Sequence, residues 1–288
     1  MDSEGVEKVG VIGLGIIGTR VAGLLAKSGR HVYVWSRTPK PVPNFLGSPA
    51  EMARLTDVIQ LFVTDGEALI QMAEALREGL GKKHTVVNCS TSDPESVVEA
   101  YQIVKDTGAS FLDAPFTGSK EAAEKGALVY YTGGDPKVLE KMRPILEVSA
   151  KEVLYLGRVG EASLLKIATN MIAASTVEAL AEAYGLIHAA GIDPDRLIEA
   201  LEHNGSSSPL VRMKLPGIVE QEYETHFSLN NMFKDIQYAL QLGKRLNVEM
   251  PASSTTANVM FRQMQKGLGD FDFSVVAKRF QEAKSKKS

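Results

Sequence analysis

The stretch that decides the fold is VGVIGLGIIG at residues 9–18, in which an apolar run leads into glycines spaced as G-x-G-x-x-G. A helical pattern starts inside this stretch at Ile16 and continues to Lys27. Between a strand and a helix, such glycines permit a tight turn, the approach of a pyrophosphate to the backbone and close helix–strand packing. A plain strand-to-helix turn would also collect glycines, but the context favours a dinucleotide-binding turn. This predicted cofactor turn comprises Gly13, Leu14, Gly15, Ile16, Ile17 and Gly18.

Strand-like and helical segments alternate from this turn through the first half of the chain. Apolar, β-branched runs predict strands at residues 31–35, 58–63, 85–87 and 110–112, and helical patterns occur at 67–77 and 94–104. Asp93 is the expected cap of the last of these helices, and a proline follows it in the first turn. This alternation predicts an α/β Rossmann domain, with a doubly wound parallel sheet covered by helices on both faces.

The second half of the chain is helical in pattern. A continuous helical segment at residues 161–190 would be about 45 Å long at 1.5 Å per residue, long enough to join two domains. Further helices are expected from Asp193-Pro194 onward and at residues 230–246, 254–266 and 274–283, and no strand-like run follows Leu156. We therefore expect a Rossmann domain at residues 1–160 and an all-helical substrate and dimerisation domain at residues 161–288.

Composition excludes several classes of protein. The net charge of −3 over 288 residues provides no basic excess for nucleic-acid binding. No apolar run approaches the roughly 20 residues of a membrane helix, and the first residues resemble neither a signal peptide nor a transit peptide. Cys89 is the only cysteine, so it cannot form an internal disulfide and fits a reducing compartment. We expect a cytoplasmic protein with a solvated tail at Lys284, Lys286 and Lys287.

The end of the second predicted strand indicates which dinucleotide binds. An NAD enzyme usually carries Asp or Glu there to hold the ribose 2′-hydroxyl, whereas this chain has Ser36, Arg37 and Thr38, with Lys40 nearby. A carboxylate would repel a 2′-phosphate, whereas a guanidinium and two hydroxyls would bind it. Arg37 could instead be a solvated loop residue, but the segment as a whole favours NADPH.

Three further segments carry candidate chemistry. Lys166 and Asn170 are four residues apart in the long helix and share one face. If Lys166 is buried, its apolar neighbours would bring its pKa toward working pH and make it a usable acid or base; extension of the side chain into water is the alternative. The loop DAPFTGS at residues 113–119 follows a strand and offers hydroxyls and backbone N–H groups to a substrate carboxylate, or is an ordinary turn. Lys234-Asp235, by itself, indicates a surface ion pair.

Together these motifs resemble the β-hydroxyacid dehydrogenase family over nearly the whole chain. The nucleotide signature of the family looks like residues 13–37, and its D-A-P-V-S-G-G substrate loop looks like residues 113–119. Its catalytic motif, G-x-x-G-x-x-x-K-x-x-x-N, resembles the segment that contains Lys166 and ends at Asn170. Its K-D pair resembles Lys234-Asp235. The serine at the end of the loop, followed by Lys120, Ala123 and Gly126, is most similar to the glyoxylate and succinic semialdehyde reductase branch. Phe116 and Thr117 replace the usual valine and serine and leave the substrate open.

The resemblance implies a role for each candidate residue. Lys166 would donate a proton to the carbonyl oxygen as hydride arrives, or remove it in the reverse direction. The residues that would bind the substrate are Thr91, Thr117, Gly118, Ser119, Asn170, Phe227 and Asp235. The residues that would bind the cofactor, besides the glycine turn and Ser36, Arg37 and Thr38, are Val63, Thr64, Thr91 and Lys234, the last of which could instead contact the substrate. No metal is implied, because hydride transfer requires only orientation and an acid, and His188 and His203 are expected on helix surfaces.

We therefore expect an NADPH-dependent oxidoreductase that interconverts a small β-, ω- or 2-hydroxy acid and its aldehyde or oxo acid, with glyoxylate or succinic semialdehyde as candidate substrates. An imine reductase shares the fold and the strand end VWSRT, but those enzymes generally carry Asp or Tyr in place of Lys166. A non-catalytic dinucleotide-binding scaffold is the third alternative, and some relatives of that kind have lost the lysine. The long helix must bury Leu164, Ile167, Met171 and Ile172, which favours a homodimer or homotetramer.

Overall fold

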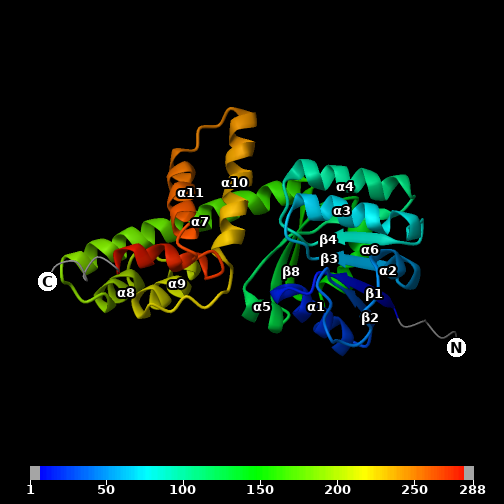
Figure 1. Ribbon diagram of the computed structural model, residues 1–288, viewed down its shortest axis with the longest axis horizontal. Helices are drawn as coiled ribbons and strands as arrows, with labels where there is room; N and C mark the ends of the chain where they lie inside the picture. The colour runs from blue at the N-terminus through cyan, green and yellow to red at the C-terminus, as the bar shows by residue number, and fades with distance from the viewer. Residues whose placement is uncertain (1–6, 282–288) are drawn as a thin grey trace. The chain divides into compact units, whose positions relative to one another are not determined.

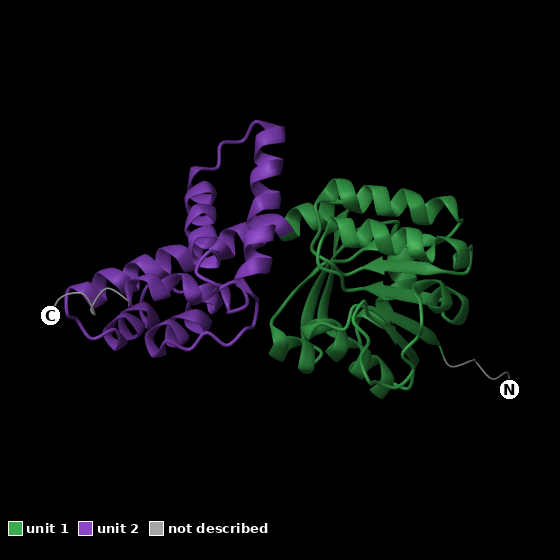
Figure 2. Ribbon diagram, in the orientation of Figure 1, with its two compact units in different colours: residues 1–166 green, residues 167–288 purple. Residues whose placement is uncertain are grey.

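The computed structural model describes residues 7–281, and the chain divides between residues 166 and 167 into two compact units (Figures 1 and 2). The sequence places the domain boundary between residues 160 and 161, whereas the packing divides the chain six residues later, inside helix α7 (Glu161–Ala189). The helix therefore begins as part of the first unit and continues as the first element of the second.

The first unit is built on the parallel sheet that the sequence predicts. Its first five strands are β1 (Lys8–Ile12), β2 (His31–Trp35), β3 (Val58–Leu61), β4 (Thr85–Asn88) and β5 (Ser110–Asp113). They lie in the order β2-β1-β3-β4-β5, and each pair is parallel. In this order the chain moves away from β1 in opposite directions, so the crevice at the carboxyl ends of β1 and β3 is the topological switch point, where ligands of doubly wound folds bind.

Three further strands extend this sheet and depart from the expected parallel arrangement. They are β6 (Phe116–Thr117), β7 (Leu128–Gly134) and β8 (Ala150–Gly157). Strand β7 runs antiparallel to β5 and β6, and only β8 is parallel to it. A parallel return requires a crossover of a dozen or more residues, and the link from β6 to β7 contains only the one-turn helix α5 (Lys120–Glu124), so the chain reverses instead.

Helices cover both faces of the sheet, as predicted. Helices α1 (Ile16–Lys27) and α6 (Pro136–Leu146) pack on one face, and α2 (Pro49–Leu55), α3 (Gly66–Leu76) and α4 (Pro94–Asp106) pack on the other (Figure 1). Side chains alternate between the two cores, since Val87 joins the first and Val86 the second. Asp93 caps α4 by accepting a hydrogen bond from Ser96 N at 2.9 Å, which confirms the predicted helix start.

The second unit is helical throughout the residues that the structure describes. After α7 its helices are α8 (Asp195–Glu202), α9 (Pro209–Glu220), α10 (Leu229–Leu246), α11 (Pro251–Met264) and the 3₁₀ helix η2 (Phe273–Phe280). The sequence predicts α10 within one residue but misses α9, which contains Pro216, and it gives no sign that the last helix is of the tighter 3₁₀ type. Residues 282–283 of that predicted helix and the lysines at 284, 286 and 287 lie outside the described residues.

Helix α7 alone has the length and mean hydropathy to cross a membrane, among the residues described. The core helix of a soluble protein has the same properties, and 44% of the most apolar window of α7 is buried inside the protein. Ala174, Val177, Ala181 and Tyr184 of this helix belong to the core of the second unit. Burial of these side chains in the core therefore explains why α7 is apolar.

Candidate functional site

The predicted cofactor turn joins β1 to α1 at the switch point of the sheet. Gly13 has a φ of +100°, and a Cβ there would lie 2.0 Å from the carbonyl oxygen of Phe62. A Cβ at Gly18 would lie 1.9 Å from the carbonyl oxygen of Gly13, so neither position accepts a side chain. A Cβ at Gly15, in contrast, would have no atom within 4 Å. The outer glycines permit the packing, and the middle one leaves the backbone approachable, as a pyrophosphate requires.

The start of α1 has the properties of an anion site. Gly15 occupies the N-cap position and provides no side-chain hydrogen bond, and the first turn holds no acidic residue. The first N–H groups of the helix therefore keep their partial positive charge for a ligand. Of the other residues in the turn, Leu14 is buried, Ile17 packs against the core and Ile16 is exposed.

The end of β2 lies beside this turn because Gly13 N donates a 2.8 Å hydrogen bond to Trp35 O. Ser36 Oγ donates to Thr38 O at 2.7 Å, which folds the segment back on itself. Arg37 is exposed, and no acceptor within residues 7–281 binds its guanidinium. Lys40 Nζ donates to Leu14 O, so a second cation reaches the cofactor turn. The segment thus presents two cations and no carboxylate.

The ends of β3 and β4 complete the switch-point crevice. Val63 N donates to Ser90 Oγ at 2.9 Å, and Thr64 Oγ1 donates to Asp65 Oδ2 at 2.9 Å. Thr91 directly follows Ser90 in the loop after β4. The structure therefore brings Val63, Thr64 and Thr91 to the same edge of the sheet as the glycine turn, as the sequence predicts.

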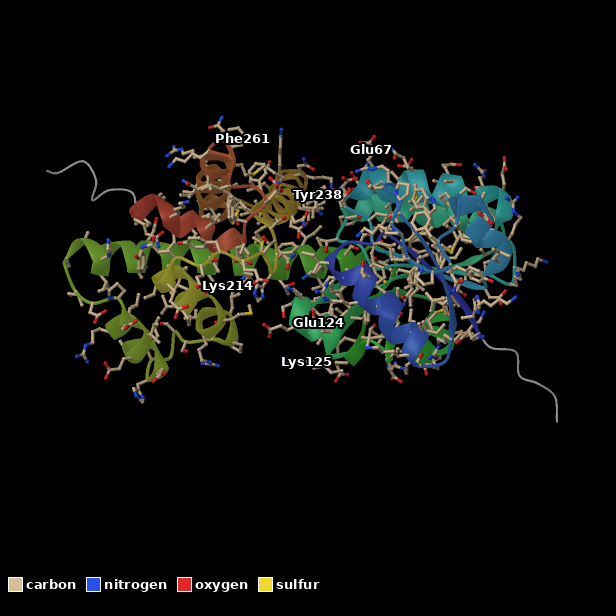
Figure 3. All side chains as sticks on the ribbon, turned by 60° about the horizontal axis from the view of Figure 1, so that its bottom comes forward. Glu67, Glu124, Lys125, Lys214, Tyr238 and Phe261 are labelled. Atoms are coloured by element: carbon tan, nitrogen blue, oxygen red, sulfur yellow. The ribbon has the colours of Figure 1, made fainter. Side chains whose placement is uncertain are left out.

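The substrate loop is held by local contacts and by helix α1. Gly118 has a φ of +134°, and Ser119 Oγ accepts a hydrogen bond from Ala122 N at 3.3 Å as the N-cap of α5. Arg20 on α1 forms an ion pair with Glu124 on α5, at 2.8 Å (Glu124 is labelled in Figure 3). The hydroxyl of Ser119 thus already serves as a helix cap, which the sequence does not indicate.

Asp113, the first residue of this loop, is fully buried and joins three elements, β4, β5 and the start of α7. Its Oδ2 accepts hydrogen bonds from Gly160 N and Ser163 N, both at 3.1 Å, and its Oδ1 accepts from Ser163 Oγ at 2.8 Å and from Asn88 Nδ2 at 3.2 Å. Burial raises the pKa of Asp113 to about 6, although all four hydrogen bonds act to lower it. The first turn of α7 is therefore anchored to the carboxyl end of β5.

Lys166 lies on α7 one turn beyond Ser163. Its side chain is only 7% exposed, so it does not extend into water as the simpler interpretation of the sequence proposes. Asn170, four residues further along the same helix, is also buried.

In the second unit, Asp235 and Phe227 are fixed by separate contacts. Asp235 is fully buried, accepts a 2.6 Å hydrogen bond from Asn170 Nδ2 and forms a 2.8 Å ion pair with Lys234. The interpretation of Lys234-Asp235 as a surface ion pair is therefore wrong, because packing of α10 against α7 buries the carboxylate. Phe227 N donates to the buried carboxylate of Asp272, which itself pairs with Lys214 at 2.7 Å (Lys214 is labelled in Figure 3).

Comparison with known proteins agrees with this geometry. Residues 8–157 match the NAD binding domain of 6-phosphogluconate dehydrogenase, and residues 160–280 match the NAD-binding domain of NADP-dependent 3-hydroxyisobutyrate dehydrogenase. The chain belongs to the β-hydroxyacid dehydrogenase family. It is accordingly an NAD(P)-dependent hydroxyacid dehydrogenase or reductase.

Two curated relatives and one solved structure illustrate the similarity of this dehydrogenase to its family. It is 33% identical to glyoxylate/succinic semialdehyde reductase 2, chloroplastic, of Arabidopsis thaliana, over all of this chain and 83% of the relative. It is 30% identical to glyoxylate/succinic semialdehyde reductase 1 of the same plant, over 93% and 96% of the two chains. The structure of Mycobacterium tuberculosis 3-hydroxyisobutyrate dehydrogenase with L-serine has the same fold, with a TM-score of 0.86 at 22% identity, over 96% of this chain and all of that one.

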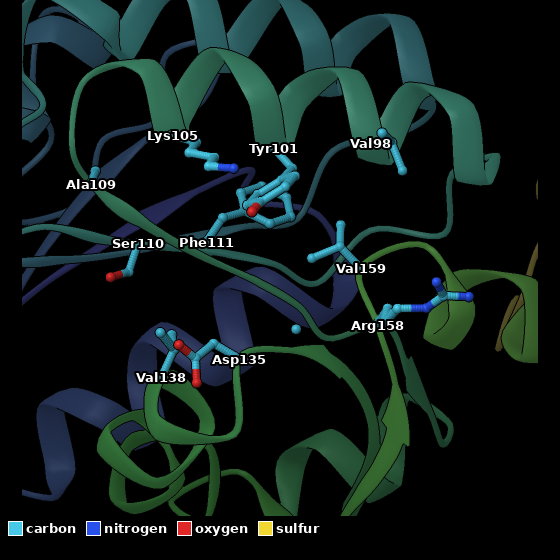
Figure 4. Close-up of a pocket in the computed structure, with 11 residues that line it drawn as sticks. Val98, Tyr101, Lys105, Ala109, Ser110, Phe111, Asp135, Val138, Arg158 and Val159 are labelled. Atoms are coloured by element: carbon cyan, nitrogen blue, oxygen red, sulfur yellow. The ribbon is translucent and has the colours of Figure 1, made fainter.

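A separate open groove of about 450 Å³ lies in the first unit of the dehydrogenase, away from the switch point (Figure 4). Tyr101 and Lys105 of α4 and Arg158 and Val159 before α7 line it, beside Ser110 at the start of β5. None of the predicted site residues lines this groove. The groove therefore lies outside the predicted site.

The dehydrogenase also contains long-range contacts that the sequence does not reveal. They are the hydrogen bonds from Lys40 Nζ to Leu14 O, from Phe227 N to Asp272, and from Gly160 N to Asp113. Asp113 belongs to the recognised loop motif, but the motif does not indicate its partners. His188 stacks on Tyr184 with the ring centroids 5.5 Å apart, and His203 is exposed.

The raised pKa of Asp113 predicts how its ionisation affects stability. The folded protein binds this proton more tightly than the unfolded chain does. The protonated carboxyl therefore adds to the free energy of unfolding below about pH 4, and this contribution is lost as the pH rises through about 6. The free energy of unfolding of the wild type, relative to Asp113→Asn, should fall by about 2–3 kcal/mol between pH 4 and 7. The Cys89 thiol, whose pKa burial raises, stays neutral over this range.

Urea unfolding at each pH measures this difference, and Asp135→Asn, which alters the exposed cap of α6, is the matched control. A difference that stays constant or increases with pH would contradict the assignment.

Proposed function

We propose that this dehydrogenase is an NADPH-dependent reductase that interconverts a small hydroxy acid and its aldehyde or oxo acid, with glyoxylate and succinic semialdehyde as the leading substrates. The observation that carries the proposal is a lysine, Lys166, buried on the helix that is anchored at the carboxyl end of β5. The names of the two plant relatives support the choice of substrates.

The residues of the first unit fit a nicotinamide dinucleotide. The open backbone at Gly15 and the uncapped start of α1 would hold the pyrophosphate, and Val63 and Thr64 would lie along it. When bound, NADPH supplies the hydride that reduces the substrate carbonyl. Ser36, Arg37 and Thr38 would bind the 2′-phosphate, since the segment contains no repelling carboxylate and Arg37 is exposed.

The protein supplies the proton and the substrate contacts. Lys166 would donate a proton from Nζ to the carbonyl oxygen in reduction and remove it in oxidation. Thr91, Thr117 and Gly118, with Ser119, would bind the substrate carboxylate through hydroxyls and backbone N–H groups. Asn170 would orient the substrate, and its amide is itself oriented by the hydrogen bond to Asp235. Phe227 would supply an apolar contact, and Lys234 would contact the cofactor or substrate.

A spectrophotometric screen with NADPH and with NADH tests this function. Glyoxylate, succinic semialdehyde, methylmalonate semialdehyde and a cyclic imine should be offered in parallel. We expect NADPH oxidation with at least one of the carboxylate-bearing aldehydes and a higher kcat/KM for NADPH than for NADH. Ser36→Asp combined with Arg37→Ala should erase that preference, because it replaces a 2′-phosphate site by a carboxylate. Turnover of the imine alone, or equal use of NADH by the unmodified enzyme, would contradict the proposal.

Lys166→Ala should lower kcat by about 10²–10⁴-fold while the enzyme still binds NADPH, because general acid catalysis supplies a factor of this size. Lys166→Arg should not restore kcat, since a guanidinium does not release its proton near neutral pH. Steady-state kcat, with NADPH affinity from fluorescence titration, measures both variants. Lys105→Ala, an exposed lysine on α4, is the control and should retain normal turnover. Near-normal kcat in Lys166→Ala would remove Lys166 from the mechanism and favour an imine reductase.

We further propose that the enzyme assembles as a homodimer or homotetramer through its helical unit. Ile167 is already buried within the chain, but Ile172 and Leu186 on α7 are 61% and 72% exposed. With Leu165, also exposed, they repeat at multiples of seven residues along one side of the helix. Light scattering at micromolar concentration should show a mass of two or four chains, and Ile172→Glu combined with Leu186→Glu should lower it. A monomeric wild type would contradict this assembly.

A further inference from the structure

We propose that Asp113 is a positioning residue of the reaction, whose carboxylate fixes the first turn of α7 and thereby the place of Lys166. The proposal rests on the proposed role of Lys166 as proton donor. Asp113 itself is buried and acts through the helix, and it need not touch the substrate or the cofactor.

The start of α7 depends on a cap that its own sequence does not provide. Leu164 N donates to Gly160 O at 3.0 Å, which makes Gly160 the N-cap residue. Glycine has no side chain with which to accept the free N–H groups of the first turn. Asp113 caps the helix instead, because its Oδ2 accepts hydrogen bonds from the N–H groups of both Gly160 and Ser163, which lie 47 and 50 positions further along the chain. The helix therefore begins where the carboxylate holds it.

The same carboxylate is tied to the strand ends at the switch point. Its Oδ1 accepts from Asn88 Nδ2, and the amide oxygen of Asn88 accepts from Ser90 N at 3.0 Å. The Ser90 hydroxyl then accepts from Val63 N and donates to Leu61 O. A continuous series of hydrogen bonds thus runs from the end of β3, through β4 and β5, to the start of α7.

Lys166 lies close enough to the anchored residue, Ser163, for the position of one to determine the position of the other. Ser163 binds Asp113 by both its backbone N–H and its hydroxyl, and Lys166 is three residues further along the helix. Residues three apart on a helix are neighbours on one face, so a shift of Ser163 moves Lys166 with it. A displacement of about 1 Å at a reacting group can lower a rate by about 10²-fold.

Only a carboxylate satisfies this arrangement. Four donors converge on the two oxygens of Asp113, from Asn88, Gly160 and, twice, Ser163. An ionised carboxylate accepts hydrogen bonds at both oxygens, whereas an amide in its place would direct its own N–H groups at two of the donors. Asp113→Asn therefore keeps the shape of the side chain and removes the anchor on one side.

The first measurement distinguishes an effect on the position of Lys166 from an effect on the stability of the fold. In Asp113→Asn, kcat should fall by about 10-fold to 10²-fold, while the Kd for NADPH stays within about twofold of the wild type. Glu178→Gln is the matched control, because it neutralises another buried carboxylate of α7, three turns from Lys166, that pairs with Arg279. It should lower the melting temperature and leave kcat within about twofold. Equal kcat in Asp113→Asn and wild type would overturn the proposal.

The second measurement is a double-mutant cycle with Lys166→Ala. If Asp113 acts through Lys166, Asp113→Asn should have no further effect on the residual kcat of Lys166→Ala. A reduction by the same factor in both backgrounds would overturn the proposal, because the carboxylate would then act by another route. Near-normal kcat in Lys166→Ala would contradict the proposed function and overturn this inference with it, whereas a low kcat in Lys166→Ala with a normal kcat in Asp113→Asn would overturn this inference alone. Should Asp113→Asn fail to fold, Ser163→Ala replaces it in the cycle, because it removes one donor and leaves the carboxylate in place.

Discussion

The buried carboxylate of Asp113 is the interaction on which the arrangement of the first unit depends. It stands at the end of β5, and it accepts hydrogen bonds from the start of α7 and from the side chain of Asn88, the last residue of β4. Burying a carboxylate is unfavourable, and the raised pKa of Asp113 expresses that penalty. A helix as long as α7 could begin with an ordinary serine cap, so the retention of this charge is explained by the direction it gives to the helix that carries Lys166.

The glycine turn is the second constraint on the arrangement of the first unit. Its first and third glycines are required by close approach of the backbone, and its second leaves the start of α1 open. The sheet order places this turn, the end of β3 and the end of β4 along one edge. Because the series of hydrogen bonds from Val63 to Ser163 starts at that same edge, the predicted cofactor turn and the start of α7 have a common support.

Local sequence patterns predict the local structure of this chain and much of its site. The bounds of α1 and β2 agree with the predicted ones, because apolar periodicity and turn glycines define them within a few residues. The antiparallel course of β7 was not predictable, since it depends on which strands pair and not on their composition. Likewise the sequence left the burial of Lys166 open and did not reveal the partners of Asp113, which lie 25, 47 and 50 positions away. Such contacts arise only when the chain is folded.

We propose that the enzyme transfers a hydride from NADPH to the carbonyl carbon of a small carboxylate-bearing aldehyde. Reduction of glyoxylate or succinic semialdehyde with NADPH deuterated separately on each face of the nicotinamide C4 tests it most directly, with the product analysed by mass spectrometry. We expect one deuterium on the carbinol carbon of the hydroxy acid from one of the two labelled cofactors and none from the other. Products without deuterium from both cofactors, or no consumption of NADPH with either aldehyde, would contradict it.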